Sequence, residues 1–284
     1  MKELDSNRLV DLHTHSLASD GSMSPSELVR YAGEIGLSAI ALTDHDTVDG
    51  VQEAIEEGEK TGVEVIPGIE ISVEYRPEMH ILGYFTDKKS YTDIRKELDT
   101  IKQGRESRNR KIIARLNELG LDINMEEVKQ VALGDIMGRP HIARVLVTKG
   151  FVKSIDEAFD KYLCREGLAY FKRFELRPEE GIRAIRRAGG LPVLAHPVFL
   201  KKSYRELDEL LAELKGYGLA GIEALYSENS KEDTGNFLRL AIKHDLIVTG
   251  GSDFHGSFKP GIELGRGRGQ LAVPYELLDK LRRA

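Results

Sequence analysis

The chain has 284 residues, of which 40% are hydrophobic and 31% are charged, and its formal net charge is −6. This composition is typical of a soluble globular protein, and the length suits one α/β barrel or two smaller domains. The negative net charge argues against a large nucleic-acid-binding surface, although it leaves room for a local basic patch.

The single cysteine and the absence of long apolar runs indicate the cellular compartment of the protein. Cys164 alone cannot form an internal disulfide and fits a reducing environment. The first residues lack a signal-peptide pattern, and no apolar run approaches the length of a membrane span. We therefore expect a cytoplasmic protein without a membrane partner.

Short apolar runs alternate with helix signals in the first quarter of the chain. Ser24, Pro25 and Glu27 form a capping-box pattern that predicts the start of a helix, and Thr47 is a candidate cap for a second one. The expected strands span residues 9–13, 37–43 and 63–67. This repetition predicts parallel strands joined by crossover helices.

The same alternation returns in the last third of the chain. Helices are expected at residues 178–188, 204–216 and 230–244, and strands at residues 191–195, 221–225 and 246–250. The predicted fold is an α/β barrel, in which the loops at the carboxyl ends of the strands build the active site.

Residues 91–176 interrupt this alternation. A long, charge-rich helical stretch is followed by three shorter candidates, of which two begin with a capping-box pattern at Asn124 and Ser154. The four stretches span residues 91–119, 124–131, 140–149 and 154–164. We therefore expect a barrel made of residues 1–90 and 177–284, with residues 91–176 inserted as a helical cap.

The cap is rich in basic residues, and for most of them we expect a solvated helix face. They include Arg105, Arg108, Arg110, Lys111, Arg139, Arg144, Lys172 and Arg173. Arg139 is the better candidate for substrate binding, because Gly138-Arg139-Pro140 marks a helix start, where backbone N–H groups favour anions.

Six of the eight histidines stand in clusters with Asp or Glu, beside strand-like apolar runs. The candidate metal ligands are His13, His15, Asp20, His45, Glu70, His80, His196, Asp253 and His255. On an extended segment, His13 and His15 point to the same face and can chelate one ion. Neutral imidazoles and carboxylates suit divalent metals, and this many ligands can hold more than one ion. The sequence therefore predicts a metal-dependent hydrolase.

Four further polar residues near these clusters have plainer interpretations. His141 and His244 stand outside the clusters and are expected to be ordinary hydrogen-bonded histidines, although His141 lies beside Arg139 and could contact a substrate. Asp44 and Asp46 flank His45 and are expected to orient other groups or to cap a helix rather than to bind metal.

The clusters together resemble the motifs of the polymerase and histidinol phosphatase (PHP) family, over roughly residues 8–87 and 177–284. The matching segments are His13-Thr14-His15-Ser16, Ser19-Asp20-Gly21, Leu42-Thr43-Asp44-His45-Asp46-Thr47, Gly68-Ile69-Glu70, Ala195-His196-Pro197 and Gly251-Ser252-Asp253-Phe254-His255. The resemblance implies a distorted seven-stranded (β/α) barrel that carries up to three divalent ions. It implies three ligand sets: His13, His15, Glu70 and Asp253; Glu70, His80 and His196; and Asp20, His45 and His255.

The helical insertion is similar to that of the stand-alone branch of this family, which includes 3′,5′-nucleoside bisphosphate phosphatases and short-RNA 5′ exonucleases. The segments Gly138-Arg139-Pro140-His141 and Tyr170-Phe171-Lys172 resemble its substrate-facing parts. The resemblance therefore implies that Arg139, His141 and Lys172 bind the substrate.

These ligands predict a phosphoesterase mechanism. Ions that share Glu70 would lower the pKa of a bridging water and supply hydroxide near neutral pH. Glu70, Asp253 and His196 are the expected catalytic residues, with Asp253 or a metal-bound histidine as the candidate proton donor to the leaving oxygen. Manganese suits the mixed nitrogen and oxygen ligands, and iron or zinc would fit the same set.

The expected substrate is a small phosphorylated molecule. The favoured function is hydrolysis of a nucleotide phosphomonoester, such as the 3′-phosphate of a 3′,5′-nucleoside bisphosphate, together with 5′–3′ exonuclease activity on short oligonucleotides. One alternative is a histidinol-phosphate phosphatase, against which the long cap and Arg139 argue. Another is a non-catalytic metal-stabilised module, against which the complete ligand set argues.

Overall fold

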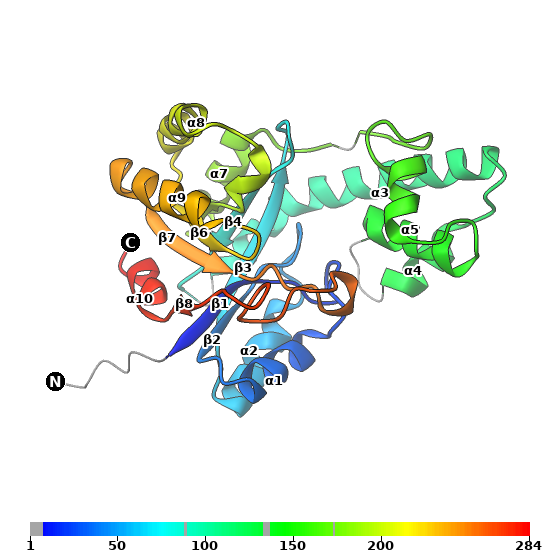
Figure 1. The fold of residues 1–284 in the computed structure, drawn as a ribbon. Helices are drawn as coiled ribbons and strands as arrows, with labels where there is room; N and C mark the ends of the chain where they lie inside the picture. The colour runs from blue at the N-terminus through cyan, green and yellow to red at the C-terminus, as the bar shows by residue number, and fades with distance from the viewer. Residues whose placement is uncertain (1–7, 88–89, 133–136, 173) are drawn as a thin grey trace.

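The structure is a computed structural model that describes residues 8–87, 90–132, 137–172 and 174–284. At its centre lies an eight-stranded sheet with the strand order β7-β6-β5-β4-β3-β2-β1-β8 (Figure 1). The strands are β1 (Leu9–Thr14), β2 (Ala39–Leu42), β3 (Glu64–Val73), β4 (Met79–Tyr84), β5 (Leu191–Leu194), β6 (Gly221–Tyr226), β7 (Ile247–Gly251) and β8 (Val273–Pro274).

The sheet curls until its two ends nearly meet. The amide of Asp253, just beyond β7, donates to the carbonyl of His13 in β1 at 2.8 Å, and Phe254 forms an isolated parallel bridge with Thr14. Gly251 is needed at this seam, because a Cβ atom there would lie 2.3 Å from Cβ of His13. The short strand β8 pairs with the outer edge of β1. The predicted α/β barrel is confirmed.

One hairpin departs from the predicted alternation. β3 continues to Val73 and turns directly into β4, which runs antiparallel to both β3 and β5. Glu70 and His80 therefore lie inside paired strands, opposite Leu82 and Ser72. The strand predicted at residues 63–67 continues past Glu70, so Glu70 and His80 lie within strands and not in loops at their carboxyl ends, because a hairpin replaces a crossover helix here.

Helices cover the outside of the sheet. They are α1 (Pro25–Glu34), α2 (Val51–Thr61), α7 (Pro178–Arg187), α8 (Tyr204–Tyr217), α9 (Lys231–Lys243) and α10 (Glu276–Arg282). The capping box predicted at Ser24 is present, with Glu27 as its partner. Thr47 does not cap α2; its hydroxyl accepts from the amide of Asp49, and the helix begins four residues later.

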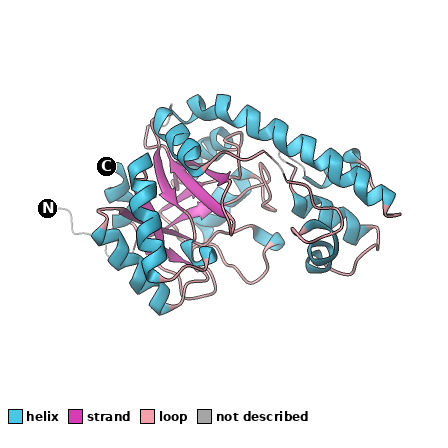
Figure 2. Ribbon diagram, turned by 90° about the horizontal axis from the view of Figure 1, so that it is seen from above, coloured by secondary structure: helices cyan, strands magenta, loops and turns pink. Residues whose placement is uncertain are grey.

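The insertion forms a helical region beside the barrel (Figure 2). It contains α3 (Arg95–Glu118), α4 (Met125–Ala132), α5 (Arg139–Thr148) and α6 (Ile155–Ala158), followed by a π-helical turn. Leu98 and Ile101 of α3 belong to the main core between the barrel strands and their covering helices, whereas Ile112 and Leu116 join a separate core with α4 and α5. The two ends of α3 thus belong to different cores. The boundaries at residues 90 and 177 stay a prediction.

The basic residues of the cap divide into buried and exposed groups. Arg105 and Arg108 are 8% and 4% exposed, so the expectation of a solvated face is wrong for both. Arg110 and Lys111 are exposed as predicted, and Arg173 lies outside the described residues. Among the helices that the structure describes, none is both long enough and apolar enough to cross a bilayer.

Candidate metal centre

All nine candidate metal ligands converge at one end of the barrel. Seven of them line a cavity of about 500 Å³, and His13 and His15 lie buried beneath its floor. The seven are Asp20, His45, Glu70, His80, His196, Asp253 and His255. Residues from distant parts of the chain therefore form a single cluster.

Glu70 lies at the centre of the cluster. Its Oε1 is 2.8 Å from Nδ1 of His80 and 2.8 Å from Nε2 of His196. Its Oε2 is 3.3 Å from Nε2 of His13, 3.2 Å from Nε2 of His15 and 3.1 Å from Nδ1 of His45. A carboxylate that reaches five imidazoles with its two oxygens is suited to bridge metal ions.

A second carboxylate completes the group around the strand β1. Asp253 Oδ1 is 3.6 Å from Nε2 of His13 and 3.2 Å from Nε2 of His15. Donor atoms of these three residues all lie within 4.8 Å of one another. Three of the four residues in the first ligand set that the family resemblance implies therefore lie together, and the ligand set itself stays a prediction.

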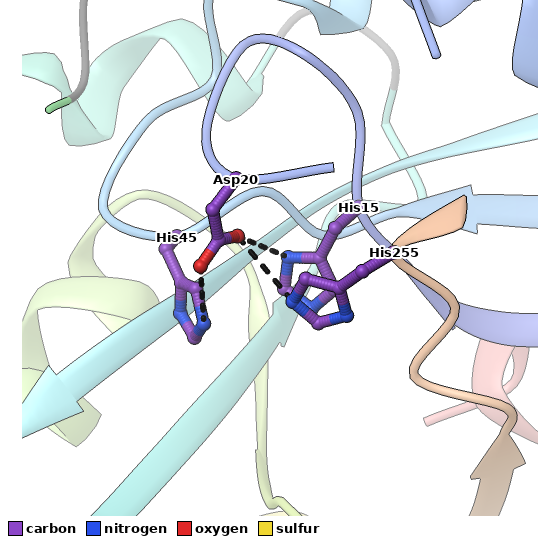
Figure 3. A group of neighbouring side chains, drawn as sticks. All are labelled: His15, Asp20, His45 and His255. Carbon is purple, nitrogen blue, oxygen red and sulfur yellow. Dashed lines mark ion pairs between the residues drawn. The ribbon is translucent and has the colours of Figure 1, made fainter. Parts of the chain in front are cut away.

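The third group surrounds Asp20 (Figure 3). Its carboxylate is 3.4 Å from Nε2 of His255, 3.9 Å from Nε2 of His45 and 3.8 Å from Nδ1 of His15. The side chain of His15 therefore stands between two groups, with Nε2 toward Asp253 and Nδ1 toward Asp20. The family resemblance places His15 in the first group alone.

The histidine ring nitrogens of the cluster are suited to bind metal ions. Five of them are buried and have no hydrogen-bond partner among the described residues: Nε2 of His13, Nδ1 and Nε2 of His15, Nδ1 of His45 and Nε2 of His80. Buried polar atoms are nearly always satisfied in proteins, so unpaired nitrogens that face carboxylates indicate a missing partner. The mixture of imidazole and carboxylate donors is suitable for divalent first-row metals.

The electrostatics keep the carboxylates charged. Burial opposes the charged form, but neighbouring histidines hold the pKa values of Glu70 and Asp253 well below their usual range. Burial likewise opposes protonation of His15, but Asp253 and Glu70 outweigh it and raise the pKa of this imidazole to about 9. For His45 burial prevails and lowers the pKa to about 3. The cluster therefore presents anionic oxygens to a cation at neutral pH.

Three buried carboxylates that the sequence analysis did not assign as ligands hold the cluster in place. Glu223 of β6 faces Nδ1 of His13 at 2.9 Å and accepts from the amide of His196 at 2.7 Å. Asp11 accepts from the amides of His13 and Ser252. Glu223 and Asp11 were missed, because an isolated acid within an apolar strand carries no motif.

The third carboxylate is Asp44, for which an orienting role was expected. It accepts hydrogen bonds from the amide and hydroxyl of Ser16 at 2.7 Å each and from the hydroxyl of Ser19 at 2.6 Å. These bonds hold the loop that presents Asp20. The geometry agrees with the orienting role and not with a helix cap.

Asp253 also has two donors on its outer oxygen. The hydroxyl of Tyr226 and the ammonium of Lys259 each lie 2.7 Å from Oδ2. Asp253 and His196 have positive φ angles of 57° and 25°, a backbone conformation that is costly for residues with side chains and that concentrates at functional sites. Tyr226 and Lys259 were not predicted, since neither belongs to a histidine cluster.

The three predicted substrate-binding residues do not lie together in the metal cavity. His141 is buried, and its Nδ1 accepts from the amide of Gly138, so it caps α5. Arg139 and Lys172 line a neighbouring cavity of about 470 Å³, which shares Pro77 and Glu78 with the first. Lys172 pairs there with Glu74.

A buried ion pair connects the cap to this site. Asp46 Oδ2 accepts from Nε of Arg105 at 2.7 Å and from Nη2 of the same guanidinium. Asp46 Oδ1 accepts from the amide of Ser72 in β3 at 3.1 Å. The residue after His45 is therefore fixed both to the strand that carries Glu70 and to helix α3.

Comparisons with known proteins agree with this geometry. A 5′-3′ exoribonuclease of Haemophilus influenzae is 35% identical over 90% of this chain and 93% of its own length. A 3′,5′-nucleoside bisphosphate phosphatase of Chromobacterium violaceum is 31% identical over 90% of each chain. A solved structure of a candidate metal-dependent phosphoesterase from Bifidobacterium adolescentis superposes with a TM-score of 0.82 at 29% identity, covering 97% of this chain and 96% of its own.

The PHP domain itself matches residues 11–169, more than half of the 284 residues. These matches confirm the predicted family and the predicted class, a hydrolase acting on phosphoester bonds. The chain belongs to the PHP family.

Proposed function

We propose that this protein is a metal-dependent phosphoesterase that removes phosphate from a nucleotide, such as the 3′-phosphate of a 3′,5′-nucleoside bisphosphate, and that also degrades short oligonucleotides from the 5′ end. The main supporting observation is that six histidines and two further carboxylates converge around Glu70, and that five buried ring nitrogens have no hydrogen-bond partner among the described residues. A structural core would not leave these polar atoms unsatisfied.

The ligand sets are part of this proposal. His13, His15, Glu70 and Asp253 would hold one ion, Glu70, His80 and His196 a second, and Asp20, His45 and His255 a third. When bound, such ions lower the pKa of water and neutralise charge that develops on the phosphoryl oxygens. These positions support the catalytic roles predicted for Glu70, Asp253 and His196.

The protein's own residues prepare the cavity for an anion. Lys259 and Tyr226 fix Asp253 by donating to its outer oxygen, and the Lys259 side chain remains 30% exposed at the cavity. Because Asp253 accepts both bonds and its pKa is held well below its usual range, it is a poor proton donor.

The names of the relatives support a nucleotide substrate. One relative is a 5′-3′ exoribonuclease and another a 3′,5′-nucleoside bisphosphate phosphatase, and each aligns with about nine tenths of this chain. Arg139 is a candidate to bind the distant part of such a substrate, because it lines the cavity next to the metal cavity.

Manganese is the proposed metal, because the donors are nitrogen and oxygen without any sulfur, and iron and zinc remain alternatives. A cytoplasmic location is also proposed, on the basis of the single cysteine.

The experiment combines metal analysis with phosphate release. The purified protein is stripped with a chelator, reloaded separately with manganese, iron or zinc, and offered adenosine 3′,5′-bisphosphate, histidinol phosphate and a short 5′-phosphorylated RNA. We expect metal-dependent hydrolysis of the nucleotide and the RNA. Hydrolysis of histidinol phosphate alone would overturn the nucleotide assignment.

Two histidine variants provide the matched control. His45→Ala should lose both metal and activity, whereas His244→Ala should retain both, because His244 pairs with Asp208 outside the cluster. Undiminished turnover in His45→Ala would overturn the proposed metal mechanism.

A further inference from the structure

One exposed aromatic ring lies inside the metal cavity. Among the described residues, the large hydrophobic side chains that are exposed are Ile35, Leu168, Phe174, Phe199, Tyr204, Leu238 and Ile242. Of these, Phe199 lines the cavity with His80, His196 and Asp253, and its exposed fraction is 37%. The exposed part of this ring is therefore available to a flat ligand that enters the cavity.

The orientation of this ring is fixed by its neighbours. Phe199 lies on the 3₁₀ turn Pro197–Leu200, which directly follows the candidate ligand His196. Its ring centroid is 5.3 Å from that of His196 and 5.7 Å from that of Tyr226, and the ring planes of Phe199 and Tyr226 are nearly perpendicular at 82°. Edge-to-face packing of this kind is favourable and holds the ring rigidly.

A second phenylalanine of the cavity provides a contrast. Phe258 is covered by the guanidinium of Arg144, which lies 3.3 Å above the ring centroid. No described cation lies over the ring of Phe199. Phe199 thus offers an aromatic surface beside the candidate ligands, whereas Phe258 already has a partner.

We propose that Phe199 is the platform on which the nucleobase of the substrate stacks while its phosphate lies at the metal ligands. Every base has a flat aromatic face, so this contact distinguishes nucleotides from phosphorylated sugars without selecting one base. A cavity of about 500 Å³ has the size of an ordinary small-molecule site. Lys201, two residues farther along, lines the same cavity and adds positive charge for an anionic ligand.

This inference rests on the proposed function, because it specifies which phosphate esters the metal centre would accept. It predicts a preference for nucleotides over phosphorylated sugars. The metal ligands alone cannot create this preference, since they would contact the phosphate that all candidate substrates share. The preference should appear in substrate binding, because a base bound outside the reacting bonds contributes equally before and during the reaction.

The test compares Phe199→Ala with the unaltered enzyme on two substrates, adenosine 3′,5′-bisphosphate and a ribose phosphate that lacks a base. We expect KM for the nucleotide to rise roughly 5- to 160-fold, the range for loss of one stacked base. KM for the ribose phosphate and the metal content should not change. Phe199→Tyr, which keeps the ring, should restore nucleotide binding.

Tyr204→Ala is the matched control, because Tyr204 is an exposed aromatic residue of similar exposure, 41%, that does not line the cavity. An equal loss on both substrates would overturn the proposal and show that the ring only supports His196. An unchanged KM for the nucleotide would overturn it as well.

Equilibrium binding separates this proposal from the proposed function. Adenosine monophosphate and ribose phosphate are titrated into the metal-loaded protein by calorimetry. If the protein hydrolyses neither substrate, the proposed function fails. The platform would still be supported if Phe199→Ala binds adenosine monophosphate more weakly than the unaltered protein does and binds ribose phosphate equally well. Equal binding of adenosine monophosphate to both proteins would overturn it.

Discussion

The barrel and the cap use their polar residues in different ways. In the barrel, short motifs carry the candidate ligands, and neighbouring strands bring them within 4.8 Å of one another in overlapping groups. In the cap, single long side chains reach toward the barrel: Arg105 to Asp46, Arg144 to Phe258 and Lys172 to Glu74. From this contrast we infer that the barrel performs the chemistry and that the cap positions the substrate and the loops around the metal centre.

The sharpest test of the barrel's role is Glu70→Gln. The substitution keeps the size of the side chain but removes the charge that faces five imidazoles, so metal binding should weaken and phosphate release should fall on the order of 10³-fold. Metal content and turnover are measured on the same preparation. Full activity without bound metal would refute the assignment of metal-dependent chemistry to the barrel.

On the cap side, the largest expected effect is on stability. Arg105→Met removes one partner of an ion pair whose side chains are 10% and 0% exposed, leaving the Asp46 carboxylate buried without this cation. Such a change costs about 3–5 kcal/mol of unfolding free energy. Thermal and denaturant unfolding measure it.

Exposed cap residues provide the control for Arg105. Arg110→Met removes an exposed charge of the same helix and should change stability by less than about 1 kcal/mol. Metal content should be retained in Arg105→Met, because the loop of His45 keeps its bonds to β3. KM should rise, because the contact that positions the cap against the barrel is lost. Loss of metal together with stability would instead make the cap part of the metal centre.

The sequence predicted the clustering of the barrel's candidate ligands better than the cap's contacts for a physical reason. A metal ligand needs a particular residue type in a particular local frame, as in His13-Thr14-His15, and this requirement leaves a pattern in a few consecutive residues. Arg105 binds a residue 59 positions away, and no local pattern distinguishes it from the exposed Arg110. Glu223, Tyr226 and Lys259 were missed for the same reason.

The secondary-structure predictions have the same limit: local patterns are predictable from the sequence, whereas pairings between distant strands are not. The capping boxes at Ser24 and Asn124 are local arrangements of a few residues and are present as predicted. The β3–β4 hairpin was not predicted, because the pairing of Glu70 with Leu82 depends on how β4 fits between β3 and β5.

Glu223→Gln tests the supports of the metal centre inside the barrel. Glu223 orients His13 and the backbone of His196 without belonging to any of the candidate ligand groups. Loss of such an outer partner typically weakens metal binding by about 10- to 100-fold, so the variant should need more metal for half-maximal activity. Competition with a chelator of known affinity measures the change. An unchanged metal affinity would limit Glu223 to a structural role.

The protonation state of the barrel histidines predicts a pH dependence. Burial opposes protonation, but carboxylates raise the pKa of His15 to about 9 and that of His80 to about 10, so both imidazoles carry a proton at pH 7 in the metal-free protein. A metal ion requires the unprotonated ring, so binding must release protons. The apparent metal affinity should therefore rise as the pH increases from 7 toward 9 and fall as the pH decreases.

Calorimetry in two buffers with different ionisation enthalpies measures the number of protons released. His244→Ala serves as the control and should release the same number, since its imidazole pairs with Asp208 outside the cluster. Metal uptake without proton release at pH 7 would contradict the prediction and show that the carboxylates do not hold these protons.

The smallest effect is expected at the outer edge of the cap, where Lys172→Met removes the ion pair with Glu74. Both side chains are about half exposed, so water and salt screen their attraction and the loss of stability should stay below about 1 kcal/mol. If the cap only positions the substrate, KM for a nucleotide should rise modestly while kcat is retained, and added salt should reduce the difference between variant and parent. A fall in kcat at unchanged KM would instead give Lys172 a part in the reaction, and the division between a reactive barrel and a positioning cap would no longer hold.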